Sequence, residues 1–492
     1  LVAAFTLAIA PFGLRFLFKP FISVLLVLAS VNSYFMDTYG VVIDDGMLRN
    51  TIQTDPREVD GLLSPVLFWH VLWAGVLPAL VVWWVPVRYA TFPRQLGRQI
   101  LTMALALAVA GAALYSHYKE FSLVGRENRN LRYLINPSYS IYSAGKLLAA
   151  ELSAGEAALR PLGRDAYQRQ HSSPGGKPRL VVFVLGETVR AHNATLEGYE
   201  RRTMPLMAQE EIVKFDSVYS CGTATAVSLP CMFSRQNRSS YDEFVSDNSE
   251  NLLDVLKHAG VRVLWRENNS GCKGVCARVK TQNTAQMDVP NYCNEDGCFD
   301  EILLYRLDES LNEPSRDTFI VLHQQGNHGP EYYKRYPPEF RKFQPECRSN
   351  RPQDCSRQEL INAYDNAILY TDFVLSRVVK FLKRNSDRYA SAMIYMSDHG
   401  ESLGESGIYL HGLPYLIAPH EQTHVPLMVW TSSDFRKGRG LERKCMSQVN
   451  DQEYSQDNLF DTVLGLFAVQ TQVYRPGQDI FAACRAIALT GR

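Results

Sequence analysis

The chain has 492 residues, too many for one ordinary hydrophobic core, so we expect two or three structural units. It carries 51 basic and 51 acidic residues, and this balance argues against a nucleic-acid-binding protein and predicts no nucleic-acid partner. Apolar runs dominate residues 1–115, whereas the rest has the composition of a soluble globular protein.

Three apolar runs come close to the length of about 20 residues that a membrane-spanning helix needs. They are Phe21–Met36, Leu63–Val85 and Ile100–Leu114. Leu1–Ala10 is apolar but short, and we interpret it as the end of a span whose start is missing. A cleaved signal peptide is the alternative, but no basic segment precedes this run and more spans follow. We therefore predict a helical transmembrane domain over 1–115.

Charged residues between these runs predict the side that each loop faces. Basic residues mark cytoplasmic loops, and those here are Arg15, Lys19, Arg88, Arg94 and Arg98. The loop over 37–60 is acidic and should lie outside the cytoplasm, as should everything after residue 115.

All ten cysteines lie at or after Cys221, in the part expected outside the cytoplasm. An even number at short spacings in an oxidising compartment predicts disulfides. The short-range pairs are Cys221/Cys231, Cys272/Cys276, Cys293/Cys298 and Cys347/Cys355, which leaves Cys445 for Cys484. The alternative is a four-cysteine zinc site made of the second and third pairs, but it leaves six cysteines unexplained.

A polar, largely helical region over 116–178 separates the two halves. Within it, Ile141–Leu152 has the pattern of an amphipathic helix lying on a membrane, and His171–Lys177 is typical of a linker. We therefore predict bridging helices and a linker over 116–178, followed by a soluble domain over 179–492.

Strand-like and helix-like segments alternate after the linker. Buried-strand patterns cover Leu180–Leu185, Val261–Trp265, Thr318–Leu322, Ala392–Met396 and Pro426–Trp430. Helical patterns cover Leu252–His258 and Gln358–Lys383. This alternation predicts an α/β fold with a mostly parallel sheet, in which ligands bind beyond the carboxyl ends of the strands.

Carboxylates and histidines follow three of these strands and should meet at one edge of the sheet. They are Glu187, His323, His328, Asp398, His399 and His411. Nitrogen and oxygen ligands of this kind suit zinc or manganese. Each residue alone is a weak signal, and we interpret His192, His258 and His420 as having no such role.

Thr225 lies in the segment TATAVS between Cys221 and Cys231. A disulfide there would brace a loop that presents the hydroxyl. Because a threonine hydroxyl is a poor nucleophile at neutral pH, it needs a base or a metal to activate it. The alternative is an ordinary turn of small residues closed by a disulfide.

Four segments together resemble the lipid A phosphoethanolamine transferases, a family that includes the mobile colistin-resistance enzymes. The segments are FVLGETVRAHN (183–193), CGTATAVSLPCMFS (221–234), NHGP (327–330) and SDHGESLGESGIYLHG (397–412). The resemblance extends over nearly the whole chain. It implies five spans of a bacterial inner membrane, the first and part of the second being absent here. It also implies a periplasmic α/β/α catalytic domain of the alkaline-phosphatase and sulfatase type.

The resemblance also implies a role for individual residues. One tightly bound Zn²⁺ would be held by Glu187, Thr225, Asp398 and His399, with Thr225 also the nucleophile. His328 and His411 would act in catalysis by binding a second zinc ion or the phosphate group. Substrate contacts are implied for Asn50, Thr54, Glu58, Asn269, Lys273 and Glu401.

The implied reaction has two halves. Thr225 attacks the phosphate of phosphatidylethanolamine and diacylglycerol leaves; a phosphate of lipid A, the lipopolysaccharide anchor, then takes phosphoethanolamine from Thr225. The capped lipid carries less negative charge and should attract polymyxins less strongly. The expected partners are therefore these two lipids and the surrounding membrane lipids, and we expect a monomer.

Four alternatives are weighed against this reaction. The acceptor could be a sugar of the lipopolysaccharide core, and the enzyme could be a phosphoglycerol transferase or a sulfatase. A sulfatase carries its nucleophile in a C/S-x-P-x-R context, which this chain lacks, and the disulfide-rich pattern argues against a phosphoglycerol transferase. A non-catalytic membrane scaffold is a further alternative, which zinc content would distinguish.

Overall fold

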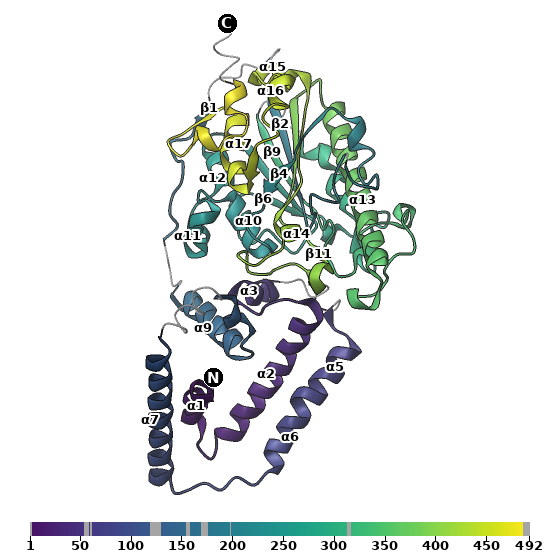
Figure 1. Ribbon diagram of the computed structural model, residues 1–492. Helices are drawn as coiled ribbons and strands as arrows, with labels where there is room; N and C mark the ends of the chain where they lie inside the picture. The colour runs from purple at the N-terminus through teal and green to yellow at the C-terminus, as the bar shows by residue number, and fades with distance from the viewer. Residues whose placement is uncertain are drawn as a thin grey trace. The chain divides into compact units, whose positions relative to one another are not determined.

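The computed structural model describes residues 2–53, 59, 62–118, 129–153, 158–168, 176–196, 198–311 and 316–485 (Figure 1). The chain divides into two compact units. The helical unit comprises Leu1–Asp45 and Leu63–Lys146, and the sheet unit comprises Gly46–Leu62 and Leu147–Arg492. The predicted linker at 171–177 lies mostly outside the described residues, and the predicted domain boundaries remain predictions.

Three helices in the described part of the helical unit are long and apolar enough to cross a membrane. They are α2 (Phe18–Tyr39), the stretch Pro65–Trp84 and α7 (Phe92–Ser116). The middle stretch consists of α5 (Pro65–Val71), the π-helical turn η2 (Leu72–Val76) and α6 (Leu77–Trp84). Large apolar side chains on these helices are exposed, as expected where lipid is the solvent. The three predicted spans are therefore confirmed as helices.

Shorter helices complete this part of the chain. The apolar segment at the start of the chain forms α1 (Val2–Ile9), which packs against α7. The predicted amphipathic helix is α9 (Ser138–Ser153). Its Ser140 Oγ accepts a hydrogen bond of 2.6 Å from Asn32 Nδ2 of α2, which satisfies a buried amide inside the helical unit.

Seven of the described strands form one sheet in the order β3-β13-β10-β2-β9-β5-β6. Their bounds are β2 Arg179–Gly186, β3 Ile212–Phe215, β5 Arg262–Glu267, β6 Lys280–Asn283, β9 Thr318–His323, β10 Ala390–Ser397 and β13 Leu427–Thr431. The five strands from β10 to β6 are parallel, whereas β13 and β3 run antiparallel to their neighbours. All five predicted strands are present, and the prediction of a mostly parallel sheet is confirmed.

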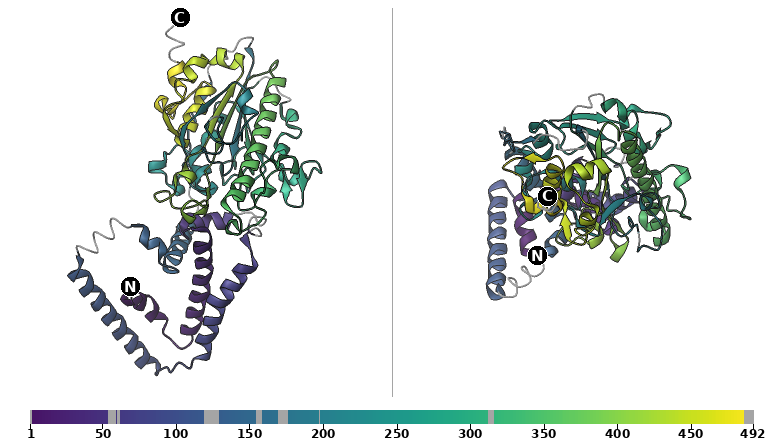
Figure 2. Two further views of the ribbon diagram at one scale, coloured as in Figure 1. Left: turned by 45° about the vertical axis from the view of Figure 1, so that its right-hand side comes forward. Right: turned by 90° about the horizontal axis from the view of Figure 1, so that it is seen from above.

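Helices cover both faces of this sheet (Figures 1 and 2). One face packs against α10 (Thr225–Phe233), α12 (Leu252–His258) and α17 (Leu459–Leu466), and the other packs against α13 (Arg357–Arg384). Alternate residues of β2 enter the two cores, so every residue of this strand is buried. This explains its continuous apolar run. The α/β/α architecture is confirmed.

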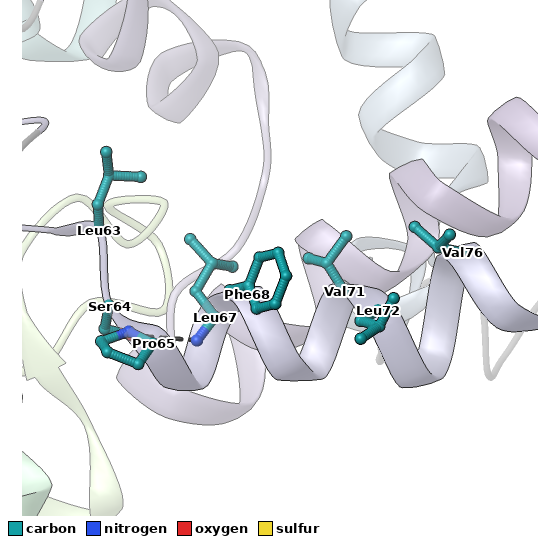
Figure 3. Close-up of a pocket in the computed structure, with 8 residues that line it drawn as sticks. All are labelled: Leu63, Ser64, Pro65, Leu67, Phe68, Val71, Leu72 and Val76. Carbon is teal, nitrogen blue, oxygen red and sulfur yellow. Dashed lines mark hydrogen bonds between the residues drawn. The ribbon is translucent and has the colours of Figure 1, made fainter.

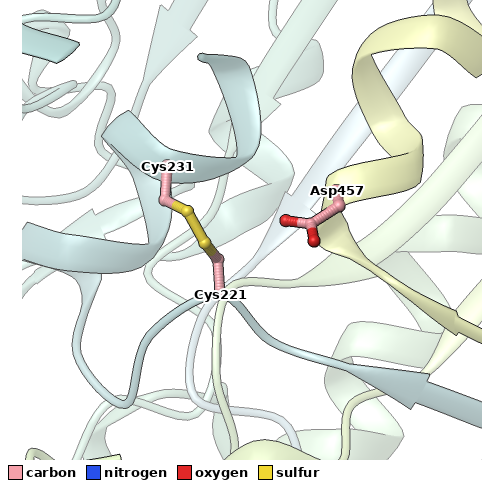
Figure 4. A group of neighbouring side chains, drawn as sticks. All are labelled: Cys221, Cys231 and Asp457. Atoms are coloured by element: carbon pink, nitrogen blue, oxygen red, sulfur yellow. A yellow bond between two sulfur atoms is a disulfide. The ribbon is translucent and has the colours of Figure 1, made fainter. Parts of the chain in front are cut away.

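All five predicted disulfides are present, including Cys445–Cys484. The alternative four-cysteine zinc site is wrong, because its thiols are consumed in the Cys272–Cys276 and Cys293–Cys298 bonds. Figure 4 shows the Cys221–Cys231 bond, which links the loop before α10 to α10 itself, with the carboxylate of Asp457 nearby. Since both sulfur atoms are bonded, this group cannot bind a metal through thiolates.

Candidate active site and metal centre

The sheet places two acidic residues side by side. Strands β2 and β10 are parallel neighbours, and Gly186 at the end of β2 is in register with Ser397 at the end of β10. Glu187 directly follows β2 and Asp398 directly follows β10, so both lie at the carboxyl edge of the sheet. This is the edge at which α/β sheets bind ligands.

Thr225 and His399 complete a compact cluster with these carboxylates. Thr225 Oγ1 lies 3.1 Å from each carboxylate oxygen of Glu187 and 3.4 Å from His399 Nε2. His399 Nε2 lies 3.3 Å from Glu187 Oε1 and 3.4 Å from Asp398 Oδ2. Glu187, Asp398 and His399 are fully buried, and Thr225 is 5% exposed. The hydroxyl therefore meets two carboxylates and an imidazole away from bulk water.

Neighbouring hydrogen bonds aim ligand atoms into this cluster. Asp398 Oδ1 accepts from the backbone N–H groups of Thr188 and His399 at 3.1 and 2.7 Å. Its Oδ2 is buried and receives no hydrogen bond from the described residues. His399 Nδ1 donates to Gly400 O at 2.8 Å, which leaves the lone pair of a neutral ring on Nε2. Three ligand atoms and one hydroxyl fit a four-coordinate cation such as zinc.

The charges of the cluster also favour a cation. Burial, together with the charge of Glu187, raises the pKa of Asp398 to about 6. Although burial lowers the pKa of His399, the charges of Asp398 and Glu187 raise it to about 10. Two buried carboxylates this close repel each other, and a divalent ion among them would offset that repulsion.

A second group adjoins the first. Candidate ligand atoms of His399, Glu401 and His411 lie within 4.8 Å of one another. Glu401 accepts hydrogen bonds from His411 Nδ1 at 2.8 Å and from the Tyr332 hydroxyl at 2.6 Å. The ring of His328 is 5.6 Å from that of His411. The structure thus brings together both histidines that were predicted to serve a second zinc ion or the phosphate.

The residues predicted to contact substrate are placed as follows. Asn269 Nδ2 donates to Glu187 Oε2 at 2.7 Å, directly at the cluster. Lys273 Nζ donates to Ser270 O at 3.1 Å and to Gln53 O at 3.0 Å. Asn50 shares helix α3 (Asp45–Gln53) with Gln53. The predictions for Thr54 and Glu58 lie outside the described residues, and all these substrate contacts remain predictions.

The Cys221–Cys231 disulfide brackets Thr225. Replacing both cysteines by alanine is expected to destabilise the protein by about 3 kcal/mol, because the bond closes a loop of about ten residues. The matched control is Cys347→Ala/Cys355→Ala, which opens a loop of similar length elsewhere. The temperature of thermal unfolding should fall in both variants, whereas the rate of amide hydrogen exchange over 222–230 should rise only in the first. Equal exchange in both variants would contradict a bracing role.

Gln456 is a positioning residue that the sequence did not reveal. It begins the turn η14 (Gln456–Asn458), and its Nε2 donates to Ser397 O at 2.9 Å and to Asp398 O at 2.7 Å. Its Oε1 accepts from Cys221 N at 2.6 Å. This one buried amide therefore ties the end of β10 to the segment that carries Thr225.

Replacing Gln456 by alanine is expected to lower the free energy of unfolding by about 3 kcal/mol, because buried backbone groups lose their partners. Denaturant titration measures this loss. Gln236→Ala is the control, since that side chain makes two backbone hydrogen bonds in a more accessible place. A loss no larger than that of the control would show that Gln456 does not hold these segments together.

A buried ion pair of His323 and Glu267 lies next to Asn269. His323, the last residue of β9, lies 2.9 Å from Glu267, the last residue of β5, and its Nε2 is 3.3 Å from Asn269 Nδ2. Burial alone would lower the pKa of His323 and raise that of Glu267. The opposite charges of the two groups outweigh burial, so the pKa of His323 is raised and that of Glu267 is lowered. The sequence indicated His323 from its place after a strand, but gave no signal for Glu267.

The helical unit contains an apolar cavity of about 560 Å³. Figure 3 shows its lining along α5 and η2, with Leu67 and Phe68 side by side and Val71 about one turn further on. The hydroxyl of Ser64 at its rim caps α5 by accepting from Leu67 N at 3.1 Å. With so little polarity, this cavity is suited to contact with hydrocarbon and not to the chemistry of the cluster.

Comparison with known proteins places these features in one family. A family model described as Sulfatase matches residues 179–469, and one described as Phosphoethanolamine transferase EptA/EptB matches 1–152. Phosphoethanolamine transferase EptA of Escherichia coli K12 is 40% identical over 474 residues, which cover 95% of this chain and 86% of that protein. Phosphatidylethanolamine transferase Mcr-1 of Escherichia coli is 41% identical, with 92% and 84% covered. The integral membrane lipooligosaccharide phosphoethanolamine transferase A of Neisseria meningitidis superposes with a TM-score of 0.92 at 40% identity, over 98% of this chain and 91% of that one.

Proposed function

Because this chain belongs to the EptA/EptB family of phosphoethanolamine transferases, we propose that Thr225 carries phosphoethanolamine, in a zinc-dependent reaction, from phosphatidylethanolamine to a phosphate of lipid A. The protein is a multi-pass protein of the inner membrane, and its sulfatase-like catalytic domain lies in the periplasm. The proposal rests above all on one observation: the Thr225 hydroxyl lies 3.1 Å from Glu187 and 3.4 Å from His399, beside an Asp398 oxygen that lacks a hydrogen bond.

Glu187, Asp398 and His399 are the residues that would hold the zinc ion next to Thr225. When bound, zinc lowers the pKa of a coordinated hydroxyl and offsets charge on an attacked phosphate. Asn269 fixes the Glu187 carboxylate, and the carbonyl of Gly400 fixes the imidazole of His399. The chain therefore supplies a rigid ligand set around one nucleophile.

The reaction proceeds in two displacements. Thr225 Oγ1 attacks the phosphorus of the donor lipid, and the bond from phosphorus to the diacylglycerol oxygen breaks. His328 and His411, with Glu401 behind His411, are the candidates to protonate that oxygen and to balance the phosphate charge. An oxygen of the lipid A phosphate then attacks the same phosphorus, and the bond to Thr225 breaks.

The identity of the acceptor is tested in cells. Expression of the wild-type chain in a bacterium without such a transferase should add phosphoethanolamine to lipid A, as seen in the mass of extracted lipid A. Polymyxin susceptibility should fall, because the modified lipid carries less negative charge. Phosphoethanolamine found only on core sugars would overturn the lipid A acceptor, and a phosphoglycerol adduct would overturn the cargo.

A further inference from the structure

A second histidine cluster lies outside the site described above. Residues 420–424 read His-Glu-Gln-Thr-His, a match to the H-E-x-x-H pattern that places two histidines on one face of a helix to bind zinc. The segment folds as the single turn α14 (His420–Thr423), with His424 as its C-cap. The rings of His420 and His424 lie 4.5 Å apart.

These two histidines share a cavity of about 330 Å³ with a third, His192, and with Glu421 and Lys214. His192 and His420 are exposed and His424 is half-buried, so an ion from solvent can reach all three. At metal–nitrogen distances of 2.0–2.1 Å, two nitrogens around a tetrahedral ion lie about 3.4 Å apart. The 4.5 Å between the centroids of the two rings is a separation at which their facing nitrogens can share one ion.

One of the rings already has the hydrogen bond that orients a metal ligand. His424 Nε2 lies 2.7 Å from Asp216 O, and a carbonyl only accepts, so Nε2 carries the proton. The lone pair of the neutral ring is therefore on Nδ1. Burial lowers the pKa of His424, which favours this neutral form. A backbone carbonyl on one ring nitrogen and a metal on the other is the usual arrangement at metal centres.

The turn that carries the pair is held rigidly. Its carbonyls accept hydrogen bonds from three backbone N–H groups: Gly400 N to Gln422 O at 3.0 Å, Glu401 N to Glu421 O at 2.8 Å and Ser220 N to Thr423 O at 2.8 Å. The donor rings are thus displayed on a fixed scaffold, which reduces the entropy lost when an ion binds.

Among the described residues, two cationic side chains line this cavity. The guanidinium of Arg190 is paired with Glu405 Oε1 at 2.7 Å. Lys214 is the other side chain that opposes a cation here. Its ammonium group is paired, however, with the carboxylate of Asp216 at 2.8 Å, which offsets part of its charge toward the histidines. Zinc peptidases carry the H-E-x-x-H pattern on a helix, whereas α14 is a turn of four residues. The residues therefore support metal binding and not peptide hydrolysis.

We propose that His420 and His424, with His192 at the same cavity, form a transition-metal site separate from the cluster around Thr225. Its ligands are imidazoles, completed by water or by Glu421, so it suits Cu²⁺, Ni²⁺ or Zn²⁺ and not Mg²⁺ or Ca²⁺. This proposal is independent of the transfer reaction.

The test uses the purified full-length protein in detergent, first loaded with zinc and freed of excess metal. Titration with Cu²⁺ should show one more bound equivalent in the wild type than in His420→Gln/His424→Gln, with nitrogen couplings from two imidazoles in the electron paramagnetic resonance spectrum. His420→Gln alone, at an exposed position, should weaken the binding of that equivalent at least about tenfold.

The matched control is His258→Gln, which removes an imidazole of the sheet unit that pairs with Glu250 and does not line this cavity. Zinc content measured after each titration shows whether copper has entered the catalytic cluster, and thermal unfolding shows that each variant is folded. Equal copper binding by the wild type and the double variant, at equal zinc content, would overturn the proposal. An extra equivalent without nitrogen couplings would overturn it as well.

Discussion

Replacement of Thr225 by alanine is expected to reduce phosphoethanolamine transfer by at least about 10³-fold, because removal of a nucleophile leaves only the binding contribution to catalysis. Among the described residues, Thr225 has the only side-chain hydroxyl that both hydrogen-bonds to Glu187 and contacts the ring of His399. Transfer from phosphatidylethanolamine to lipid A by the purified protein, followed as radiolabelled product, measures the loss.

Two further variants make this experiment specific. Thr225→Ser keeps a hydroxyl at the same place and should retain measurable transfer. Thr223→Ala is the matched control, since Thr223 lies in the same loop but donates its hydrogen bond to Leu413 O at 2.6 Å and not to Glu187. If Thr225→Ala transferred at a rate within tenfold of the wild type while folded, the assignment of the nucleophile would be wrong.

Removal of the metal is expected to have the second large effect. Dialysis against a chelator should abolish transfer, and added Zn²⁺ should restore it. Because the ion binds only the folded state, its loss should also lower stability, by about 4 kcal/mol when free zinc is at 1,000 times its dissociation constant. Activity and thermal unfolding, recorded on the same samples, give both readouts.

Asp398→Asn tests the same claim within the chain. It removes the charge of the carboxylate whose Oδ2 lacks a hydrogen bond, so zinc content should fall well below one ion per chain. Asp372→Asn is the control, because Asp372 is also buried but accepts only backbone hydrogen bonds, from Leu206 and Met207. Full activity in the chelated protein, or equal zinc in both variants, would contradict a zinc-dependent mechanism.

Much of the fold could be predicted because its signals are local. The run at 180–185 is apolar throughout because both faces of this strand are buried. The spans are continuous apolar runs because their helices are long and apolar enough to cross a membrane. Close spacing likewise predicted four disulfides, and the fifth followed by elimination. The π-helical turn at 72–76 was not predictable, because a change in hydrogen-bond register leaves hydrophobicity unchanged.

The site was predictable only in part. Strand ends indicated Glu187, Asp398 and His399, since parallel strands bring their following residues to one edge. Thr225 is the first residue of α10, and no local sequence pattern predicts that it lies close to that edge. Only the family resemblance indicated that Thr225 belongs to the site. Gln456 lies 58 residues from Asp398 and 235 from Cys221, so no local pattern could reveal that it joins them.

The covalent step is the central claim, and the mass of the intact protein tests it most directly. After zinc-loaded wild-type protein is exposed to phosphatidylethanolamine without acceptor, we expect a mass increase equal to one phosphoethanolamine group, located by peptide fragmentation on Thr225. Thr225→Ala should show no increase under the same conditions. The absence of the adduct on the wild type, or the same adduct on Thr225→Ala, would contradict the mechanism.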